Sequence, residues 1–159
     1  RVIRSISAHT LPQLAEALTR PVLSTGRLFP NALPTLEALR ELRFKIALVS
    51  NTPWGTPEYL WMQQVERLGL SPFLDVQLFS SAVGWSKPDA RIFGLALERL
   101  GCRPDEAIFI GDDYSADIQG AKAAGLTAIW IDRKGEEPPD EARHADRVIT
   151  SLRELLPTH

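Results

Sequence analysis

From residue 30 onward, short apolar runs alternate with amphipathic helical segments, and this alternation is the strongest constraint on the fold. Leucines recur at every third position from Leu33 to Leu42 with charged residues between them, which is typical of an amphipathic helix. The run Phe44–Val49 that follows is short and apolar, as buried strands are. Strands that alternate with helices of about ten residues predict an α/β domain with a mostly parallel sheet.

The same alternation continues to the C-terminus. Further helices are predicted at 58–68, 88–100, 115–124 and 151–156, and further strands at 76–79, 107–110, 127–131 and 148–149. The stretch 136–140, which contains two prolines, is predicted to be a solvated loop. The N-terminal part follows a different pattern, with a helix predicted at 11–18 and a loop at 21–27. We therefore expect an N-terminal helical segment, 1–27, followed by an α/β core, 28–159.

Composition is that of one domain with a hydrophobic core, because 44% of the 159 residues are apolar and 24% are charged. The net charge is −2, with 18 basic and 20 acidic residues well mixed, which argues against a nucleic-acid or membrane partner. No apolar run approaches the roughly 18 residues of a membrane span. The single cysteine, Cys102, excludes a disulfide within the chain and fits a reducing, cytoplasmic setting. Because residue 1 is Arg and the only methionine is Met62, we expect translation to begin upstream.

Parallel α/β sheets carry their chemistry at the carboxyl ends of the strands, and the richest such loop follows the predicted strand 107–110. It reads Gly111-Asp112-Asp113-Tyr114-Ser115-Ala116-Asp117. Carboxylate oxygens suit Mg²⁺, so Asp112, directly after the strand, is the first candidate metal ligand. Asp117, one helical turn on, is expected to orient a water or to pair with a lysine. Asp113 is a weaker candidate, because an aspartate there also caps the following helix.

Two other loops add polar groups at the same edge of the predicted sheet. Lys87 precedes Pro88, which opens a helix and holds the lysine near the crevice, where its charge can neutralise phosphate oxygens. Ser50 and Asn51 end an apolar strand and offer a hydroxyl and a backbone N–H to a phosphoryl oxygen, although such residues end many strands without a function. Trp54, in the stiff loop that follows, either contacts a substrate or a cap, or covers the edge of the core.

Together the three loops resemble the haloacid dehalogenase superfamily. Its members have a strand ending in Ser or Thr, then a Lys-Pro helix start, then a strand followed by Gly-Asp with another Asp about four or five residues on. In this chain the corresponding blocks are Ala47–Thr52, Ser86–Phe93 and Ile108–Gly125, in the same order. The likeness covers about residues 28–157 and implies a Rossmann-like three-layer sandwich.

The resemblance also implies a function, which is Mg²⁺-dependent hydrolysis of a small phosphorylated substrate through an aspartyl-phosphate. Ser50 and Lys87 would be catalytic and would bind the phosphoryl group together with Asn51. Asp112 would hold Mg²⁺, with Asp117 as an additional acidic contact. Dehalogenation of 2-haloacids is the less favoured activity, because the acidic loop suits metal-assisted phosphate chemistry.

One block of the superfamily pattern is missing. Its first motif, Asp-x-Asp-x-Thr at the end of the first strand, supplies the nucleophile, but no aspartate precedes Asp75 in this chain. In the superfamily that strand lies between the serine strand and the Gly-Asp strand, so we expect a gap in the sheet. An upstream segment, a second copy of the chain, or the segment Val2–Ile6, which carries no aspartate, could fill it. Residues 1–27 are then interpreted as the remnant of a helical cap.

Three alternatives compete with an enzyme of this superfamily. The missing nucleophile is compatible with a catalytically inactive domain that binds phosphate and Mg²⁺ or serves as a scaffold. A dinucleotide-binding domain would carry Gly-x-Gly-x-x-Gly after a strand, and no such run occurs. A response-regulator receiver domain would need its phosphoacceptor aspartate early in the chain, where none precedes Asp75.

Overall fold

The computed structural model describes residues 10–132 and 144–157, and within them five strands form two parallel sheets. In the first sheet β1 (Ala47–Ser50) pairs with β2 (Val76–Phe79). In the second, β4 (Thr127–Ile131) lies between β3 (Ile108–Gly111) and β5 (Arg147–Ile149). The α/β class and the parallel pairing are as predicted.

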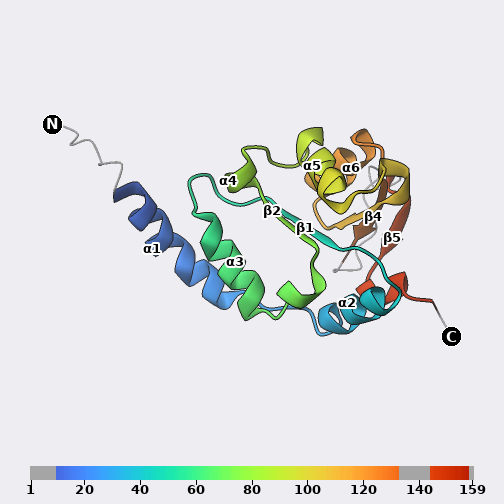
Figure 1. The fold of residues 1–159 in the computed structure, drawn as a ribbon, viewed down its shortest axis with the longest axis horizontal. Helices are drawn as coiled ribbons and strands as arrows, with labels where there is room; N and C mark the ends of the chain where they lie inside the picture. Colours follow the sequence, from blue (N-terminus) through green and yellow to red (C-terminus); the bar gives the residue numbers. More distant parts are fainter. Residues whose placement is uncertain (1–9, 133–143, 158–159) are drawn as a thin grey trace.

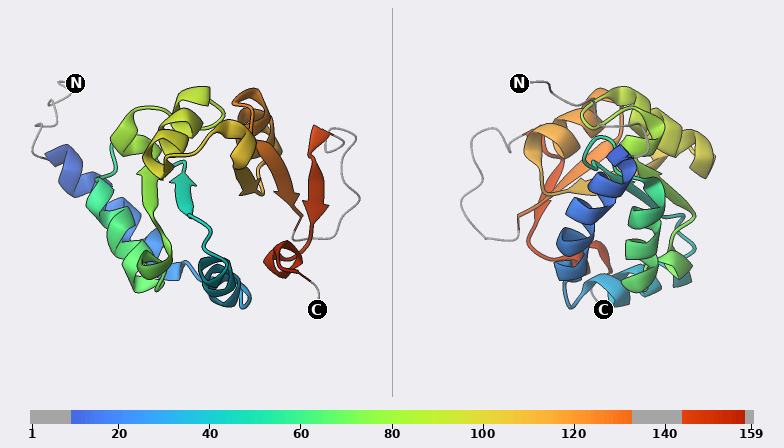
Figure 2. Two further views of the ribbon diagram at one scale, coloured as in Figure 1. Left: turned by 45° about the vertical axis from the view of Figure 1, so that its right-hand side comes forward. Right: turned by 90° about the vertical axis from the view of Figure 1, so that its left-hand side faces the viewer.

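The two sheets are not joined, since no strand in the described part of the chain pairs with both β1 and β3. Figure 2 shows the sheets standing apart, with β1 and β3 on the edges that face each other. This is the gap expected where the superfamily has its first strand. The segment Val2–Ile6, one of the three ways considered to fill it, lies outside the described residues, and so does the predicted loop 136–140.

Helices lie on both sides of the strands, which makes three layers (Figures 1 and 2). On one side α5 (Ala90–Leu100) packs on β1 and β2, and α6 (Gly120–Ala123) packs on β4. On the other side α2 (Ala32–Glu41) contacts the short C-terminal helix η5 (Leu152–Leu155). Short helical turns complete the connections: η1 (Ser71–Phe73), α4 (Ser80–Val83) and η2 (Pro104–Glu106).

The hydrophobic core lies between α5 and the strands. The sequence favours helix α5 because Asp89 caps its start by accepting a hydrogen bond from the backbone of Arg91, and Gly101 ends it in the left-handed conformation. Ile92 and Phe93 of this helix are fully buried. Phe93 meets Phe109 of β3 edge to face, with ring centroids 4.9 Å apart. A fully buried side chain of this size stabilises the fold by about 1.5–3 kcal/mol.

The N-terminal helix α1 (Thr10–Thr25) is longer than predicted and runs through Pro21, so the loop predicted at 21–27 is wrong over most of its length. Proline removes one backbone donor from a helix interior and normally ends or kinks it. Here Pro21 is exposed, so water can satisfy the freed carbonyl, and α3 (Glu58–Arg67) supports the end of the helix. The guanidinium of Arg67 donates to the carbonyls of Leu23 and Gly26, at 3.0 Å each.

The other predicted helices and strands differ from the observed ones by at most two residues at an end, except for two that differ more. The strand predicted at 44–49 begins only at Ala47, because Arg43 takes a positive φ of 63° after α2, and Phe44 is half exposed. The helix predicted at 115–124 is divided into η3 (Tyr114–Gln119), a wide π-helical turn, and α6. π-Helical turns are rare and often mark functional sites.

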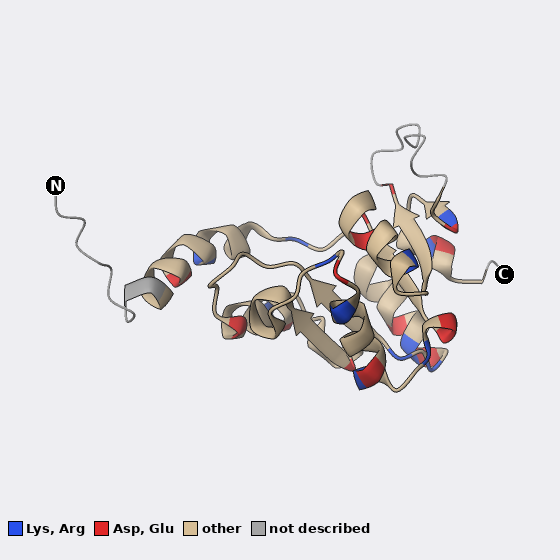
Figure 3. Ribbon diagram, turned by 90° about the horizontal axis from the view of Figure 1, so that it is seen from above, with Lys and Arg blue, Asp and Glu red and all other residues tan. Residues whose placement is uncertain are grey.

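Charged side chains of both signs are interspersed over the helices, as the mixed sequence predicts (Figure 3). None of the helices in residues 10–132 and 144–157 is long and apolar enough to cross a membrane.

Candidate functional site

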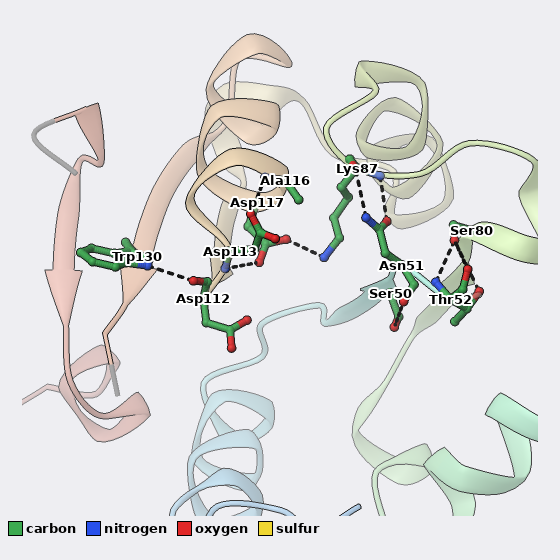
Figure 4. Close-up of polar contacts among 10 residues, drawn as sticks. All are labelled: Ser50, Asn51, Thr52, Ser80, Lys87, Asp112, Asp113, Ala116, Asp117 and Trp130. Carbon is green, nitrogen blue, oxygen red and sulfur yellow. Dashed lines mark hydrogen bonds and ion pairs between the residues drawn. The ribbon is translucent and has the colours of Figure 1, made fainter. Parts of the chain in front are cut away.

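Three loops at the carboxyl ends of β1, β2 and β3 meet at one edge of the fold (Figure 4). Ser50 is the last residue of β1, Lys87 lies in the connection that follows β2 and α4, and Asp112 directly follows β3. Hydrogen bonds between Lys87 and both neighbouring loops hold the three together. The structure thus places the predicted site residues near one another, across the gap between the two sheets.

The side chain of Lys87 is held by an ion pair. Its ammonium nitrogen lies 2.6 Å from Oδ1 of Asp117, and the two side chains are 11% and 5% exposed. The same ammonium lies 5.3 Å from the ring centroid of Phe109, within range of a cation–π interaction. Lys87 is therefore a positive charge fixed at the edge of the site rather than a mobile surface lysine.

Asp89, two residues after Lys87, anchors the start of α5. Arg91 donates side-chain and backbone hydrogen bonds to its carboxylate, and they lower the pKa of Asp89 to about 2. The backbone next to Lys87 is thus fixed by a charged helix cap.

The side chain of Asn51 pairs with the backbone of Lys87. Nδ2 of Asn51 donates to the carbonyl of Lys87 at 2.9 Å, and the N–H of Lys87 donates to Oδ1 of Asn51 at 2.8 Å. The predicted contact between Asn51 and phosphate stays a prediction, and both ends of its amide already have a partner.

Two hydroxyls of α4, the short helix after β2, connect the next residue to that segment. The N–H of Thr52 donates to Oγ of Ser80 at 2.8 Å, and Oγ1 of Thr52 donates to Oγ of Ser81 at 2.9 Å. The N–H of Ser81 donates back to Oγ1 of Thr52 at 3.0 Å. Sequence reasoning missed Ser80 and Ser81, because serines after a strand are indistinguishable from ordinary turn residues.

The hydroxyl of Ser50 makes only a poor contact with its neighbour. Its Oγ lies 3.5 Å from the carbonyl oxygen of Asn51, which is too long for a strong hydrogen bond. The hydroxyl can therefore turn toward another acceptor, as the predicted role in binding a phosphoryl oxygen requires.

The three aspartates of the acidic loop have different surroundings. Oδ1 of Asp113 accepts from the N–H of Ala116 at 2.8 Å, which is the helix-capping contact weighed against metal binding. Oδ2 of Asp117 accepts from the N–H of Asp113 at 3.1 Å, so this carboxylate has both a backbone and a lysine partner. The carboxylate of Asp112 points away from the other two in Figure 4.

A neighbouring strand positions Asp112. Trp130 of β4 lies opposite Gly111 in the β3–β4 register, and its Nε1 donates to the carbonyl of Asp112 at 3.1 Å. Sequence reasoning missed this tryptophan because a large apolar residue inside a strand is usually part of the core. Only the pairing of β3 with β4 shows that it reaches the loop.

A magnesium site with one or two protein carboxylates fits the acidic loop better than a site with three. In the described residues no three His, Cys, Asp or Glu side chains come together as a metal site. Mg²⁺ typically binds one or two protein carboxylates and completes its shell with water and phosphate oxygens. Asp112 could supply one such carboxylate. Ligation by Asp117 or Asp113 stays a prediction, and it would compete with the contacts that these residues already make.

Gly111 is required for the packing of Asp117. A Cβ atom at position 111 would lie 2.1 Å from Oδ2 and 2.3 Å from Cβ of Asp117, distances that no side chain could tolerate. The glycine of the Gly-Asp sequence therefore leaves room for the side chain of Asp117. Trp54 is 95% exposed, so it does not cover the core edge, and contact with a substrate or cap stays a prediction.

A family model of haloacid dehalogenase-like hydrolases matches residues 8–125. The chain belongs to this family. The match agrees with the resemblance found in the three loops and includes Ser50, Lys87 and Asp112. It also crosses the boundary predicted at 27/28, so the division into an N-terminal segment and a core stays a prediction.

Among curated proteins, the chain is 34% identical over 98% of its length to a glyceraldehyde 3-phosphate phosphatase from Methanopyrus kandleri and spans 68% of that protein. It is 36% identical over 89% of its length to a ribulose-1,5-bisphosphate 5-phosphatase from Halopiger xanaduensis and spans 61% of it. The chain thus corresponds to about two thirds of these relatives.

Solved structures show the same fold. The structure of a haloacid dehalogenase-type phosphatase from Thermococcus onnurineus superimposes with a TM-score of 0.74 at 35% identity, covering 88% of this chain and 61% of that one. A 2-haloacid dehalogenase from Pseudomonas syringae pv. Tomato DC3000 also gives 0.74, at 30% identity, covering 95% and 62%. The fold therefore does not by itself separate phosphatase from dehalogenase.

Proposed function

We propose that this chain carries the phosphate-binding and metal-binding part of a Mg²⁺-assisted phosphomonoester hydrolase. The observation that supports this most strongly is Lys87, whose ammonium is fixed by Asp117 at 2.6 Å between the ends of β1 and β3. A fixed positive charge beside a serine hydroxyl and a carboxylate suits a phosphoryl group. Substrates would be small organic phosphates, consistent with the names of the phosphatase relatives.

The nucleophile would be a carboxylate that is not in this chain, carried by a strand between β1 and β3. It would attack phosphorus and break the bond to the ester oxygen, which leaves as an alcohol after taking a proton. Water would then attack the aspartyl-phosphate, releasing inorganic phosphate and restoring the carboxylate.

The residues of this chain would act on the phosphoryl oxygens. Lys87 would neutralise their charge, and the hydroxyl of Ser50 would donate a hydrogen bond to one of them. Asp112 would hold Mg²⁺, which when bound supplies further neutralisation of phosphoryl charge. Asp117 would keep the ammonium of Lys87 in place.

The test is a titration of the isotope-labelled 159-residue chain with inorganic phosphate, with and without Mg²⁺, followed by NMR. We expect Mg²⁺ to strengthen phosphate binding, and Lys87→Ala to weaken it by roughly tenfold or more, as for the loss of a charge-assisted hydrogen bond. Asp112→Asn should abolish the effect of Mg²⁺. Lys122→Ala is a matched control, because Lys122 pairs with Asp146 at the same 2.6 Å on the surface.

Binding that survives both Lys87→Ala and Asp112→Asn would overturn the proposal. A turnover assay with p-nitrophenyl phosphate then separates an enzyme from an inactive binding domain. Turnover is expected once a strand ending in Asp-x-Asp-x-Thr is joined upstream of residue 1 through a flexible linker. Phosphate binding without turnover in that extended chain would favour the binding or scaffold alternative.

A further inference from the structure

The side-chain amide of Asn51 both donates a hydrogen bond to the backbone of Lys87 and accepts one from it, as two residues of neighbouring strands do in a sheet. One hydrogen bond runs from Nδ2 to the Lys87 carbonyl at 2.9 Å, and the other from the Lys87 N–H to Oδ1 at 2.8 Å. A donor and an acceptor on one planar group restrict both the position and the orientation of the backbone they bind. The main chain of Lys87 is therefore tied to the end of β1, although the residues are 36 positions apart.

The other end of this connection is also anchored. Ser50, just before Asn51, is paired with Phe79 of β2, and Thr52, just after it, is fixed to Ser80 by its backbone N–H at 2.8 Å. Thr52 and Ser80 are both buried. Asn51 therefore projects from a short segment that is held on both sides, and its amide is a rigid attachment for the loop it binds.

The consequence for the site lies in the ammonium group of Lys87. The lysine side chain is long, and its tip meets Asp117 only if its backbone starts from the right place. Asp117 itself belongs to η3, the helical turn that follows β3 in the other sheet. Asn51 and Asp117 thus hold the two ends of Lys87 from opposite sides of the gap between the sheets, as Figure 4 shows.

We propose that Asn51 is a positioning residue that acts through Lys87 rather than by touching the phosphate. This inference rests on the proposed function of Lys87 as the phosphate-binding cation. The competing role is the direct phosphate contact that the sequence predicts, since Nδ2 carries a second hydrogen. The two roles differ in whether the effect of Asn51 depends on Lys87.

A double-mutant cycle separates them. Inorganic phosphate is titrated into the parent chain, Asn51→Ala, Lys87→Ala and the double variant, and the dissociation constants are measured by NMR. We expect Asn51→Ala to weaken binding about fivefold in the parent chain, as for the loss of about one hydrogen bond, and to have no further effect in Lys87→Ala. Equal effects in both backgrounds would overturn the positioning role and indicate direct contact.

A second measurement does not depend on phosphate. Hydrogen exchange of the Lys87 backbone amide should become at least several-fold faster in Asn51→Ala, because its acceptor is lost. Asn31→Ala is the matched control, since it removes another asparagine contact, to Oγ of Ser151, without touching this loop. An unchanged exchange rate at Lys87 in Asn51→Ala would overturn the inference.

The phosphate titration and the hydrogen-exchange measurement test the proposed function and the positioning role of Asn51 separately. If phosphate fails to bind the parent chain, or if Lys87→Ala leaves its affinity unchanged, the proposed function is wrong. The exchange rate of the Lys87 amide still decides in that case whether Asn51 positions this lysine.

Discussion

The ammonium of Lys87 and the carboxylate of Asp117 lie 2.6 Å apart, although the two residues are 30 positions apart and come from loops that follow strands in different sheets. Their side chains are almost fully buried, at 11% and 5% exposure. The pair is therefore both the centre of the site and a link between the two halves of the fold.

Breaking this pair should destabilise the chain more than breaking a similar pair on the surface. In Lys87→Met the carboxylate of Asp117 loses its cation in a buried place, which typically costs about 3 kcal/mol. Lys122→Met removes the partner of Asp146 from a surface pair in which the lysine side chain is 41% and the aspartate side chain 37% exposed. This change should lower the free energy of unfolding by less than about 1 kcal/mol. Urea unfolding followed by circular dichroism measures both; equal losses would contradict the structural role of the buried pair.

Gly120 allows α6 to approach the loop that carries Lys87. A Cβ there would lie 2.8 Å from Cε2 of Phe93 and 2.9 Å from Cα of Pro88. Gly120→Ala should therefore lower the free energy of unfolding by about 1–3 kcal/mol, as overpacking does. Gly94→Ala is the control, because no atom lies within 4 Å of its Cβ and alanine favours a helix by about 0.5–1 kcal/mol. Melting temperatures that change in the same direction in both variants would contradict the close packing of α6 against the loop that carries Lys87.

Trp130 should affect metal binding through the loop it supports. Trp130→Phe removes the hydrogen bond from Nε1 to the Asp112 carbonyl and keeps an aromatic ring in place. We expect Mg²⁺ to bind several-fold more weakly, with a stability loss of about 1 kcal/mol. Trp61→Phe removes a comparable bond, from its Nε1 to Oγ1 of Thr56 at 3.0 Å, and should leave Mg²⁺ affinity unchanged. Calorimetric titration with Mg²⁺ distinguishes the two; indistinguishable affinities would disprove a specific role for Trp130.

The pH dependence of stability should reveal the cap formed by Asp89. Hydrogen bonds from Arg91 lower its pKa from 3.8 to about 2, so the folded chain favours the ionised carboxylate. A lowered pKa stabilises the fold above the unfolded value, near 3.8, and this contribution is lost as the pH falls toward 2. Asp89→Asn keeps a capping oxygen but not the charge. Its melting temperature should lie below that of the parent chain above about pH 4 and approach it near pH 2. A difference that stays constant across this range would exclude the charged cap.

Much of the fold follows from local patterns in the sequence. The boundaries of β2 and β4 agree with their predicted ranges, because short apolar runs bounded by turn residues leave little choice. α1 shows the limit of such reasoning. Pro21 normally ends a helix, and here the guanidinium of Arg67, which comes from a distant helix, adds a tertiary contact to the carbonyl of Leu23 near the end of α1.

The sequence by itself determined which residue types stand at the carboxyl ends of the strands, because Ser50, Lys87 and Asp112 occur at the spacing of a known family. It also determined that no aspartate is available early in the chain to act as nucleophile. These properties depend only on residue types and their spacing along the chain, which can be read from the sequence without knowledge of the fold.

Only the tertiary structure decided how these residues are used. In the folded chain, the side chain of Asn51 is hydrogen-bonded to the backbone of Lys87, and the ammonium of the same lysine forms an ion pair with Asp117. The indole of Trp130 donates a hydrogen bond to the carbonyl of Asp112. Each contact joins segments that are 18 to 36 positions apart. The physical reason is that such contacts depend on strand register and loop packing, which bring together groups whose separation along the chain carries no information about their distance.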